Sequence, residues 1–404
     1  MDCLLLCNKD LPEICAGDVK ELIGKECTVM PSICIVEDIS TEEIATLAYH
    51  CQSAHRIIPL LTSFDCPLLD PSEESVHINS LGDFLKDNTS NELGNEERQL
   101  LEAASTFALR VSKTVHSDLP SPDIEEMLGG WYHDRAKANS MELGVDLDRP
   151  ELPIHAILTN DKCFVGVDVI GFDLSRRPYK LLPYPSSLNG VMAYTIARAV
   201  GLTRETVVLD PFCGSGTIPI EASLYQNGVS PFTLENSFAA FSIPLFRDAF
   251  ENVRESTREQ ELTITGKVTG YDNQFKVMTL AKKHAKIAHI KDALTISKVD
   301  IDWVDMKFDE DSVDVIITNP PKENRKANNY KEIRKLYDDF CYQIRHILKP
   351  TGRAGVLLIK PQLLVEAAKP HNLEVEQNLT IHSGEQEYQL VILKKRSDEP
   401  AKWD

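Results

Sequence analysis

The sequence predicts an α/β protein in which a doubly wound parallel sheet follows two smaller α+β units. After residue 200, short apolar runs alternate with stretches of helical periodicity, as in parallel strands joined by crossover helices. Before residue 182 the alternation is irregular, and one strand pair is joined by Asn160-Asp161, a hairpin turn signal. The length of 404 residues suits two or three domains.

Residues 1–85 predict the first α+β unit. The segment 27–38 has the apolar, β-branched composition of a strand. The segment 40–58 has helical periodicity, and Ser40 or Thr41 can cap its first turn. The unit therefore combines a helix with short strands.

Residues 105–182 predict the second α+β unit, and the polar segment 86–104, in which no apolar periodicity is visible, predicts a linker before it. Within the unit, 106–113 has a strand pattern, and 121–139 opens with Ser-Pro-Asp, which is typical of a helix start. Residues 152–171 predict the two strands of the hairpin.

Residues 183–397 predict the larger α/β domain, in which ligands are expected at the carboxyl ends of the strands. A helix over 188–201 comes first, and a long insertion, 230–262, interrupts the later alternation. Strands are predicted at 206–210, 267–272, 293–300, 313–321 and 353–360, with helices at 217–228 and 275–290.

Composition and charge limit the functions that the chain can have. The chain is 42% hydrophobic and carries a formal charge of −19, which argues against nucleic-acid binding by net charge alone. Local basic groups remain, because net charge does not decide the local field. They are Lys322, Arg325, Lys326, Lys331, Arg334 and Lys335, and separately Arg176, Arg177 and Lys180; a solvated surface is the alternative interpretation of both.

The sequence predicts a cytoplasmic protein that does not associate with a membrane. No stretch near 18 apolar residues is present, and the first residues lack the basic region and apolar core of a signal peptide.

The cysteines predict no metal site. Seven of the ten precede residue 70, and none forms a Cys-x-x-Cys pair. We expect small buried hydrophobic side chains in a reducing compartment rather than metal ligands or disulfides. The seven are Cys3, Cys7, Cys15, Cys27, Cys34, Cys51 and Cys66.

The segment VVLDPFCGSGTIPIEA carries the strongest functional motif. A buried strand ends in Asp210, a turn with Gly214 and Gly216 follows, and then a helix begins. Glycines let a ligand approach the backbone, and the free N–H groups of the helix start can bind a carboxylate. The Asp210 carboxylate can accept from an ammonium group, so the motif favours an amino-acid-like ligand over a pyrophosphate. The predicted cradle comprises Asp210, Phe212, Cys213, Gly214, Ser215, Gly216 and Thr217.

Acidic residues end the next two predicted strands. Asp272, followed by Asn273, stands where an acid binds ribose hydroxyls in doubly wound folds. Asp300 and Ile301 end the third strand, where they can contact an adenine edge. For both acids, helix capping or simple solvation is the alternative.

The fourth strand leads into Asn319-Pro320-Pro321-Lys322. Prolines have no N–H donor, so this turn leaves carbonyl groups free to accept hydrogen bonds. The Asn319 side-chain oxygen and the Pro320 carbonyl could bind both hydrogens of an –NH2 group and stabilise charge developing on its nitrogen. This chemistry needs no metal and no covalent intermediate.

These motifs resemble class I S-adenosylmethionine-dependent amino-methyltransferases, in particular those with a THUMP domain that modify guanine N2 in RNA. The segment 144–180 resembles the end of a THUMP domain, and residues 1–85 resemble the ferredoxin-like unit that precedes it. The resemblance implies a Rossmann-like methyltransferase domain behind ferredoxin-like and THUMP-like domains, with S-adenosylmethionine as cofactor.

The resemblance also implies roles for the site residues. The 210–217 cradle would bind the methionine part of the cofactor, Asp272 the ribose, and Asp300 with Ile301 the adenine. Asn319, Pro320 and Pro321 would bind the target amine. The family carries an aromatic residue at position 322 and glycine at 323, where this chain has Lys322 and Glu323. Lys322 could contact a phosphate or a base, and Tyr330 could supply the planar partner.

The predicted activity is N2-methylation of guanine in tRNA. The same chemistry on ribosomal RNA is one alternative, and a catalytically silent RNA-binding protein is another. Adenine N6 methylation in DNA shares the Asn-Pro-Pro step, but the THUMP-like half argues against it. Related enzymes can also depend on a small zinc-binding activator protein that adds to the methyltransferase sheet.

Overall fold

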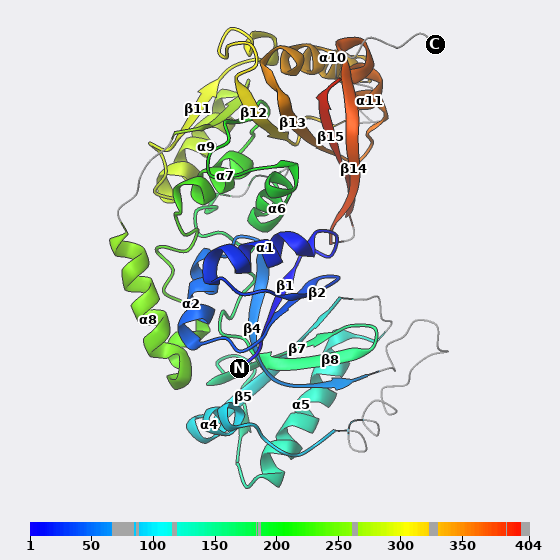
Figure 1. Cartoon of the computed structure of the whole chain (residues 1–404). Helices are drawn as coiled ribbons and strands as arrows, with labels where there is room; N and C mark the ends of the chain where they lie inside the picture. Colours follow the sequence, from blue (N-terminus) through cyan, green and yellow to red (C-terminus); the bar gives the residue numbers. More distant parts are fainter. Residues whose placement is uncertain are drawn as a thin grey trace. The chain divides into compact units, whose positions relative to one another are not determined.

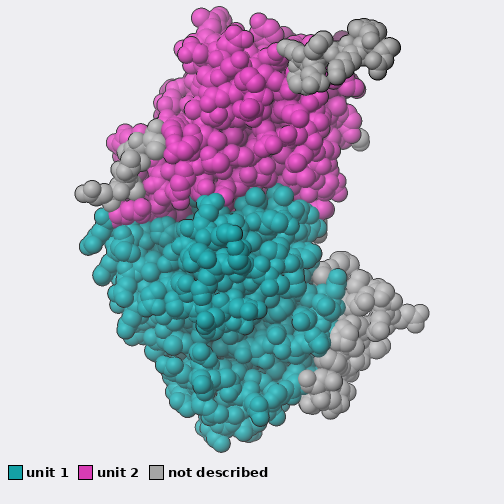
Figure 2. All heavy atoms as spheres, in the orientation of Figure 1, with its two compact units in different colours: residues 1–174, 234–259 teal, residues 175–233, 260–404 magenta. Residues whose placement is uncertain are grey.

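The computed structural model divides the chain into two compact units, which Figure 2 shows in different colours. Unit 1 comprises Met1–Leu174 and Leu234–Glu259, and unit 2 comprises Ser175–Thr233 and Gln260–Asp404. The structure describes all residues except 67–84, 86–88, 115–118, 183, 185–186, 261–265, 323–329, 385 and 397–404. The four-part division expected from the sequence remains a prediction.

Unit 1 contains an eight-stranded sheet in the order β2-β3-β1-β4-β8-β7-β5-β6. The apolar alternation predicted for 106–113 and 152–171 appears as β5 and the β7–β8 hairpin, which confirms these elements. The strands are β1 (Cys3–Cys7), β2 (Thr28–Met30), β3 (Ile33–Val36), β4 (Ala54–Asp65), β5 (Thr106–Lys113), β6 (Gly144–Val145), β7 (Leu152–Leu158) and β8 (Lys162–Val167).

Two predictions for the first unit are wrong in detail. The segment 27–38 forms β2 and β3, because the chain turns at Ser32, whose φ is +68°. The helix predicted over 40–58 is α2 (Thr41–His50), and β4 follows it, because Ile57 and Ile58 are buried in the sheet. Ser40 is confirmed as the cap: its side chain accepts from the Glu43 amide, and the Glu43 side chain accepts from the Ser40 amide.

Helix α4 (Asn95–Ala103) lies in the segment predicted to be a linker. It packs through a buried ion pair in which Arg135 of α5 (Ser121–Ala138) donates to both carboxylate oxygens of Glu97. Both side chains are at most 4% exposed. A long-range ion pair leaves no periodic apolar signal in the sequence, so the polar composition of this segment gave the wrong prediction.

The insertion predicted at 230–262 contributes α8 (Pro244–Glu259) to unit 1, where α8 packs against α2 (Figure 1). Its apolar face buries Phe246 and Phe250. Before it, Phe238 packs edge to face on Tyr49 with ring centroids 5.0 Å apart. Helix α1 (Pro12–Ile23) also belongs to unit 1.

Unit 2 contains a seven-stranded sheet in the order β11-β10-β9-β12-β13-β15-β14. The first five strands in this order are parallel, and β15 and β14 join antiparallel at one edge. The strands are β9 (Val208–Asp210), β10 (Val268–Asp272), β11 (Leu294–Lys298), β12 (Val313–Thr318), β13 (Leu348–Leu358), β14 (Leu373–Ser383) and β15 (Gln386–Lys395). The parallel sheet is confirmed, whereas the sequence analysis did not include the β14–β15 hairpin.

Helices lie around this sheet and bury its apolar strands (Figure 1). Tyr337, Phe340 and Ile344 of α10 pack in one core cluster with Ile316 of β12 and Val356 of β13. The helices are α6 (Gly190–Val200), α7 (Thr217–Asn227), α9 (Phe275–Ile287), α10 (Tyr330–Ile347) and α11 (Gln362–Ala368). Over the ranges that the structure describes, no helix combines the length and apolarity needed to cross a membrane.

Candidate active site

A pocket of about 560 Å³ opens at the carboxyl ends of β9, β10, β11 and β12 in unit 2. This position follows from the parallel sheet, because the turns after neighbouring strands meet at one edge. The volume is in the range of small-molecule and cofactor sites. Fourteen of the fifteen predicted site residues line it: Asp210, Phe212, Cys213, Gly214, Ser215, Thr217, Asp272, Asn273, Asp300, Ile301, Asn319, Pro320, Pro321 and Lys322.

Gly216, the fifteenth, lies behind the pocket wall. It caps α7 with a φ of +85°, a conformation that favours glycine. A Cβ at this position would lie 2.9 Å from the Cβ of Ala281 in α9. Gly216 therefore shapes the turn by allowing α7 and α9 to approach, and it does not line the cavity.

Hydroxyl groups connect the glycine turn to the segment before α6. Ser215 Oγ donates to Ser187 Oγ at 2.8 Å, and Ser187 Oγ lies 2.9 Å from the Thr217 hydroxyl. Ser187 also lines the pocket. The sequence analysis did not select Ser187, because a lone serine outside a motif carries no specific signal.

Asp210 is a buried carboxyl group at the end of β9, only 1% exposed. Its Oδ1 accepts from the Thr318 hydroxyl at 2.7 Å and from the Phe212 amide at 3.1 Å. Burial raises the pKa of Asp210 to about 7, although both hydrogen bonds oppose the shift. A cation beside this group would favour the carboxylate.

The acids at or just after the ends of the next two strands, Asp272 and Asp300, both line the pocket and accept hydrogen bonds there. Asp272 accepts from the Gly214 amide at 3.1 Å and from the Gln274 amide at 2.8 Å. Asn273 donates to Asp300 Oδ2 at 3.3 Å. Asp300 also caps the short 3-10 helix Ile301–Trp303, so capping and a place in the pocket are compatible here.

Asn319 lines the pocket and carries a buried acceptor. Its Oδ1 is buried, and within the described parts of the chain it has no hydrogen-bond partner. Burying an amide oxygen without a partner costs on the order of 1–3 kcal/mol. A ligand with an N–H group would remove this cost.

Lys322 lies half-buried at the same edge, and burial lowers its pKa. Its Nζ lies 4.7 Å from the ring centroid of Tyr388 in β15, a cation–π contact. Tyr388 was not predicted from the sequence, because it lies on β15, an antiparallel strand that follows the alternating parallel strands and helices. Tyr330, the predicted planar partner, is 43% exposed at the start of α10 and does not line the pocket.

The two predicted basic groups differ in the structure. Arg177 is fully buried in an ion pair with Glu221 of α7, and its neighbour Lys180 donates to Ser187 Oγ at 2.7 Å. These two residues therefore stabilise unit 2 internally. Lys331, Arg334 and Lys335 are exposed on α10, whereas Glu323, Arg325 and Lys326 lie outside the described residues.

A parallel sheet with a glycine turn after its central strand and acids at the next two strand ends defines a Rossmann-like nucleotide-binding class of enzyme. Within this class, the chain belongs to the RMKL-like methyltransferase family, because residues 177–389, more than half of the chain, match the family's methyltransferase domain. Residues 95–168 match the THUMP domain. This match begins with α4, inside the segment that the sequence analysis took as a linker.

Several characterised sequences are similar to this chain. A tRNA (guanine(6)-N2)-methyltransferase of Methanocaldococcus jannaschii is 28% identical over 69% of this chain and 73% of its own length. An Archaeoglobus fulgidus protein of the same name is 27% identical, and the match spans 64% of its length. A ribosomal RNA large subunit methyltransferase K/L of Vibrio parahaemolyticus is 26% identical, and this chain spans only 29% of its length.

Solved structures share the fold along nearly the whole chain. SMU.472 complexed with SAH superimposes with a TM-score of 0.75 at 19% identity, covering 98% of both chains. TrmN from Thermus thermophilus superimposes with a TM-score of 0.65 at 22% identity, covering 98% of this chain and 99% of its own. The folds of the two units thus occur together in other single chains.

Proposed function

We propose that this protein transfers a methyl group from S-adenosylmethionine to guanine N2 in tRNA. The observation that carries the proposal is the buried Oδ1 of Asn319, which has no hydrogen-bond partner among the described residues and belongs to a residue that lines the same pocket as the acidic cradle. One wall of the pocket suits a cationic, nucleoside-containing cofactor, and the other suits an –NH2 group.

The chemistry of the donor set fits S-adenosylmethionine. Asp210 would accept from its ammonium group, Asp272 would bind the ribose hydroxyls, and Asp300 would bind the adenine amine. The cofactor supplies an electrophilic methyl group on a positively charged sulfur.

Asn319 would act on the guanine amine that receives the methyl group. Its Oδ1 and the Pro320 carbonyl would accept the two hydrogens of the guanine amine and direct the nitrogen lone pair toward the methyl group. Both acceptors stabilise the positive charge that develops on nitrogen, an interaction that strengthens in the transition state. The Tyr337 hydroxyl, which donates to the Pro321 carbonyl at 3.1 Å, fixes the backbone of this turn.

The RNA substrate is proposed from the THUMP domain and from the relatives. The relatives from Methanocaldococcus jannaschii and Archaeoglobus fulgidus are named as tRNA (guanine(6)-N2)-methyltransferases. Lys331 and Arg334 are exposed on α10, the helix whose Leu336 lines the pocket, and they offer local positive charge despite the net charge of −19. Lys335 on the same helix forms an ion pair with Asp339. A flipped guanine would then reach the Asn319 wall from a docked tRNA.

The test is labelled methyl transfer from S-adenosylmethionine to unmodified bulk tRNA and, separately, to ribosomal RNA, followed by nucleoside analysis. We expect N2-methylguanosine in tRNA. Label in ribosomal RNA alone would support the second candidate, for which the similarity to the K/L methyltransferases argues. Cofactor binding without label in either RNA would contradict the proposed activity and support a silent RNA-binding protein.

Two further expectations belong to this function. A small zinc-binding activator, if one is required, would add to an edge of the seven-stranded sheet, at β11 or β14. Full activity of the chain purified alone would exclude that dependence. The reaction is proposed to take place in the cytoplasm, which localisation of a tagged protein would test.

A further inference from the structure

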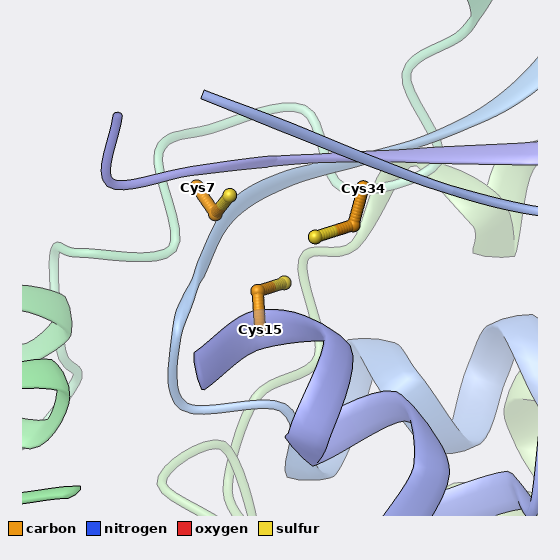
Figure 3. A group of neighbouring side chains, drawn as sticks. All are labelled: Cys7, Cys15 and Cys34. Carbon is orange, nitrogen blue, oxygen red and sulfur yellow. The ribbon is translucent and has the colours of Figure 1, made fainter. Parts of the chain in front are cut away.

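Three cysteine side chains from separate elements of unit 1 converge (Figure 3). Cys7 ends β1, Cys15 lies on α1, and Cys34 lies in β3. Their sulfur atoms all lie within 4.8 Å of one another. Each side chain is buried: Cys15 and Cys34 are 0% exposed and Cys7 is 5% exposed. Sequence spacing hides this group, because the ligands come from three elements rather than from one turn.

The geometry points to zinc(II) bound by the thiolates of Cys7, Cys15 and Cys34, a site that we propose as a structural metal centre. Because the three sulfur atoms lie within 4.8 Å of one another, an ion at their centre would be at most about 2.8 Å from each of them. The Zn–S bond is about 2.3 Å long. Shifts of a few tenths of an ångström would close the site.

Cys51 supplies the fourth ligand in this proposal. It is fully buried at the end of α2, and its sulfur lies outside the group within 4.8 Å, so Cys51 would move toward the other three on metal binding. It also lies 3.8 Å from Asp18 Oδ2, which accepts from the Ser53 hydroxyl at 2.6 Å. A second layer of polar groups of this kind orients ligands. Four thiolates in a closed, buried site match the coordination of structural zinc.

Metal binding would connect elements that are far apart in the sequence. Zinc would displace one proton from each thiol to solvent and join β1, α1, β3 and the end of α2. The Cys34 thiol donates to the Pro12 carbonyl at 3.2 Å, an interaction that metal binding would replace. Because the sulfurs are buried, the ion should enter during folding and leave only on unfolding.

The experiment measures metal in the full-length protein, purified under reducing conditions. We expect about one zinc per chain by elemental analysis, which follows from one closed site. After unfolding with a chelator, refolding without zinc should lower Tm by more than about 5 °C, and added zinc should restore it. Refolding with cobalt(II) should give the intense visible absorption of a tetrahedral thiolate complex.

Cys3 provides a matched control, because it lies in the same strand as Cys7, is 0% exposed and is outside the group. Cys34→Ala should lose the zinc, whereas Cys3→Ala should retain it. Cys51→Ala should weaken zinc binding at least tenfold. Absence of stoichiometric zinc in the reconstituted wild type, copper in its place, or equal loss in Cys3→Ala would overturn the site. An unchanged affinity in Cys51→Ala would overturn the fourth ligand. None of these outcomes depends on methyl transfer.

Discussion

Asn319 concentrates the chemistry of the site in one side chain, because its buried Oδ1 has no partner among the described residues. Asn319→Ala should lower the rate of methyl transfer at least about 100-fold, as loss of a charge-stabilising group does. Cofactor affinity should stay within about threefold, since the cradle is untouched. Single-turnover transfer and equilibrium cofactor binding measure the two quantities.

Asn273 is the matched control in the same pocket. Asn273→Ala removes the hydrogen bond to Asp300 and should weaken cofactor binding with little change in the rate at saturation. If Asn319→Ala behaved like Asn273→Ala, the assignment of Asn319 to the target amine would be wrong.

Asp210 makes the stability of the protein depend on pH. Its pKa is raised to about 7 by burial, from an ordinary value of 3.8. A carboxyl group with a raised folded pKa favours the folded state fully below its unfolded pKa, and this contribution is lost as pH rises through the folded pKa. Asp210→Asn avoids the loss and retains an acceptor for Thr318.

Thermal unfolding without cofactor tests this effect. Asp210→Asn should match the wild type near pH 4 and exceed it above pH 7, by roughly 2–4 kcal/mol. The exposed Asp309→Asn should show no such trend. A stability gain that is the same at pH 4 and pH 8 would exclude titration of Asp210 as the cause. Cofactor binding by Asp210→Asn should weaken at both pH values.

Lys322, which lines the same pocket as Asn319, forms a cation–π contact with Tyr388. The Lys322 Nζ lies 4.7 Å from the centroid of the Tyr388 ring. We expect Lys322→Ala and Tyr388→Ala each to raise the KM for RNA about tenfold and to leave cofactor affinity unchanged. The double variant should lose less than the sum, because the two residues share one interaction worth about 0.5–2 kcal/mol.

Tyr388→Phe retains the ring and serves as the control for this pair. It should keep the RNA KM within about twofold, since the cation–π contact requires the ring face and not the hydroxyl. Strict additivity of the two alanine variants would show that the pair does not act together.

At the scale of elements, the turn between β9 and α7 depends on Gly216. An alanine there would have a φ of +85° and a Cβ 2.9 Å from the Ala281 Cβ, so α7 and α9 would have to separate. Gly216→Ala should destabilise the protein by roughly 2–4 kcal/mol and weaken cofactor binding. Denaturant unfolding and cofactor titration measure both effects.

Gly266 serves as a control that separates backbone strain at a positive φ from steric crowding of an added Cβ. It has a φ of +60°, but a Cβ there would meet no atom of the described residues within 4 Å. Gly266→Ala should therefore cost only the conformational part, about 1–2 kcal/mol, and should leave cofactor binding intact. Equal costs at the two glycines would mean that the contact between α7 and α9 is not what requires Gly216.

At the scale of the whole molecule, the chain leaves unit 1 after Leu174 and returns to it for Leu234–Glu259. A fragment of residues 1–174 lacks α8 and the buried Phe238, Phe246 and Phe250. Its Tyr49 would lose aromatic contacts with Phe238 and Phe250. We expect this fragment to be at least about 3 kcal/mol less stable than one to which Leu234–Glu259 is fused.

Urea unfolding of the two fragments measures that difference. The matched control fuses the same residues with Phe238 and Phe250 replaced by Ser, which keeps the length and removes the apolar contacts. If all three fragments unfolded at the same urea concentration, α8 would not belong to the core of unit 1.

Much of the site was predictable from the sequence because it depends on local patterns. The run from Asp210 to Thr217 predicts a strand, a glycine turn and a helix, and the periodic strands imply that Asp272, Asp300 and Asn319 meet at one edge. The helix over 121–139 and the hairpin at Asn160-Asp161 were predictable for the same reason.

The sequence by itself determined the parallel sheet, the glycine turn after β9 and the Asn-Pro-Pro turn after β12, since periodicity, glycine and proline act over a few residues. Only the tertiary structure decided the contacts between distant residues. It placed Tyr388 beside Lys322, packed α4 through the Glu97–Arg135 pair, and brought Cys7, Cys15 and Cys34 together. Such contacts arise from the path of the whole chain, and no spacing along the sequence records them.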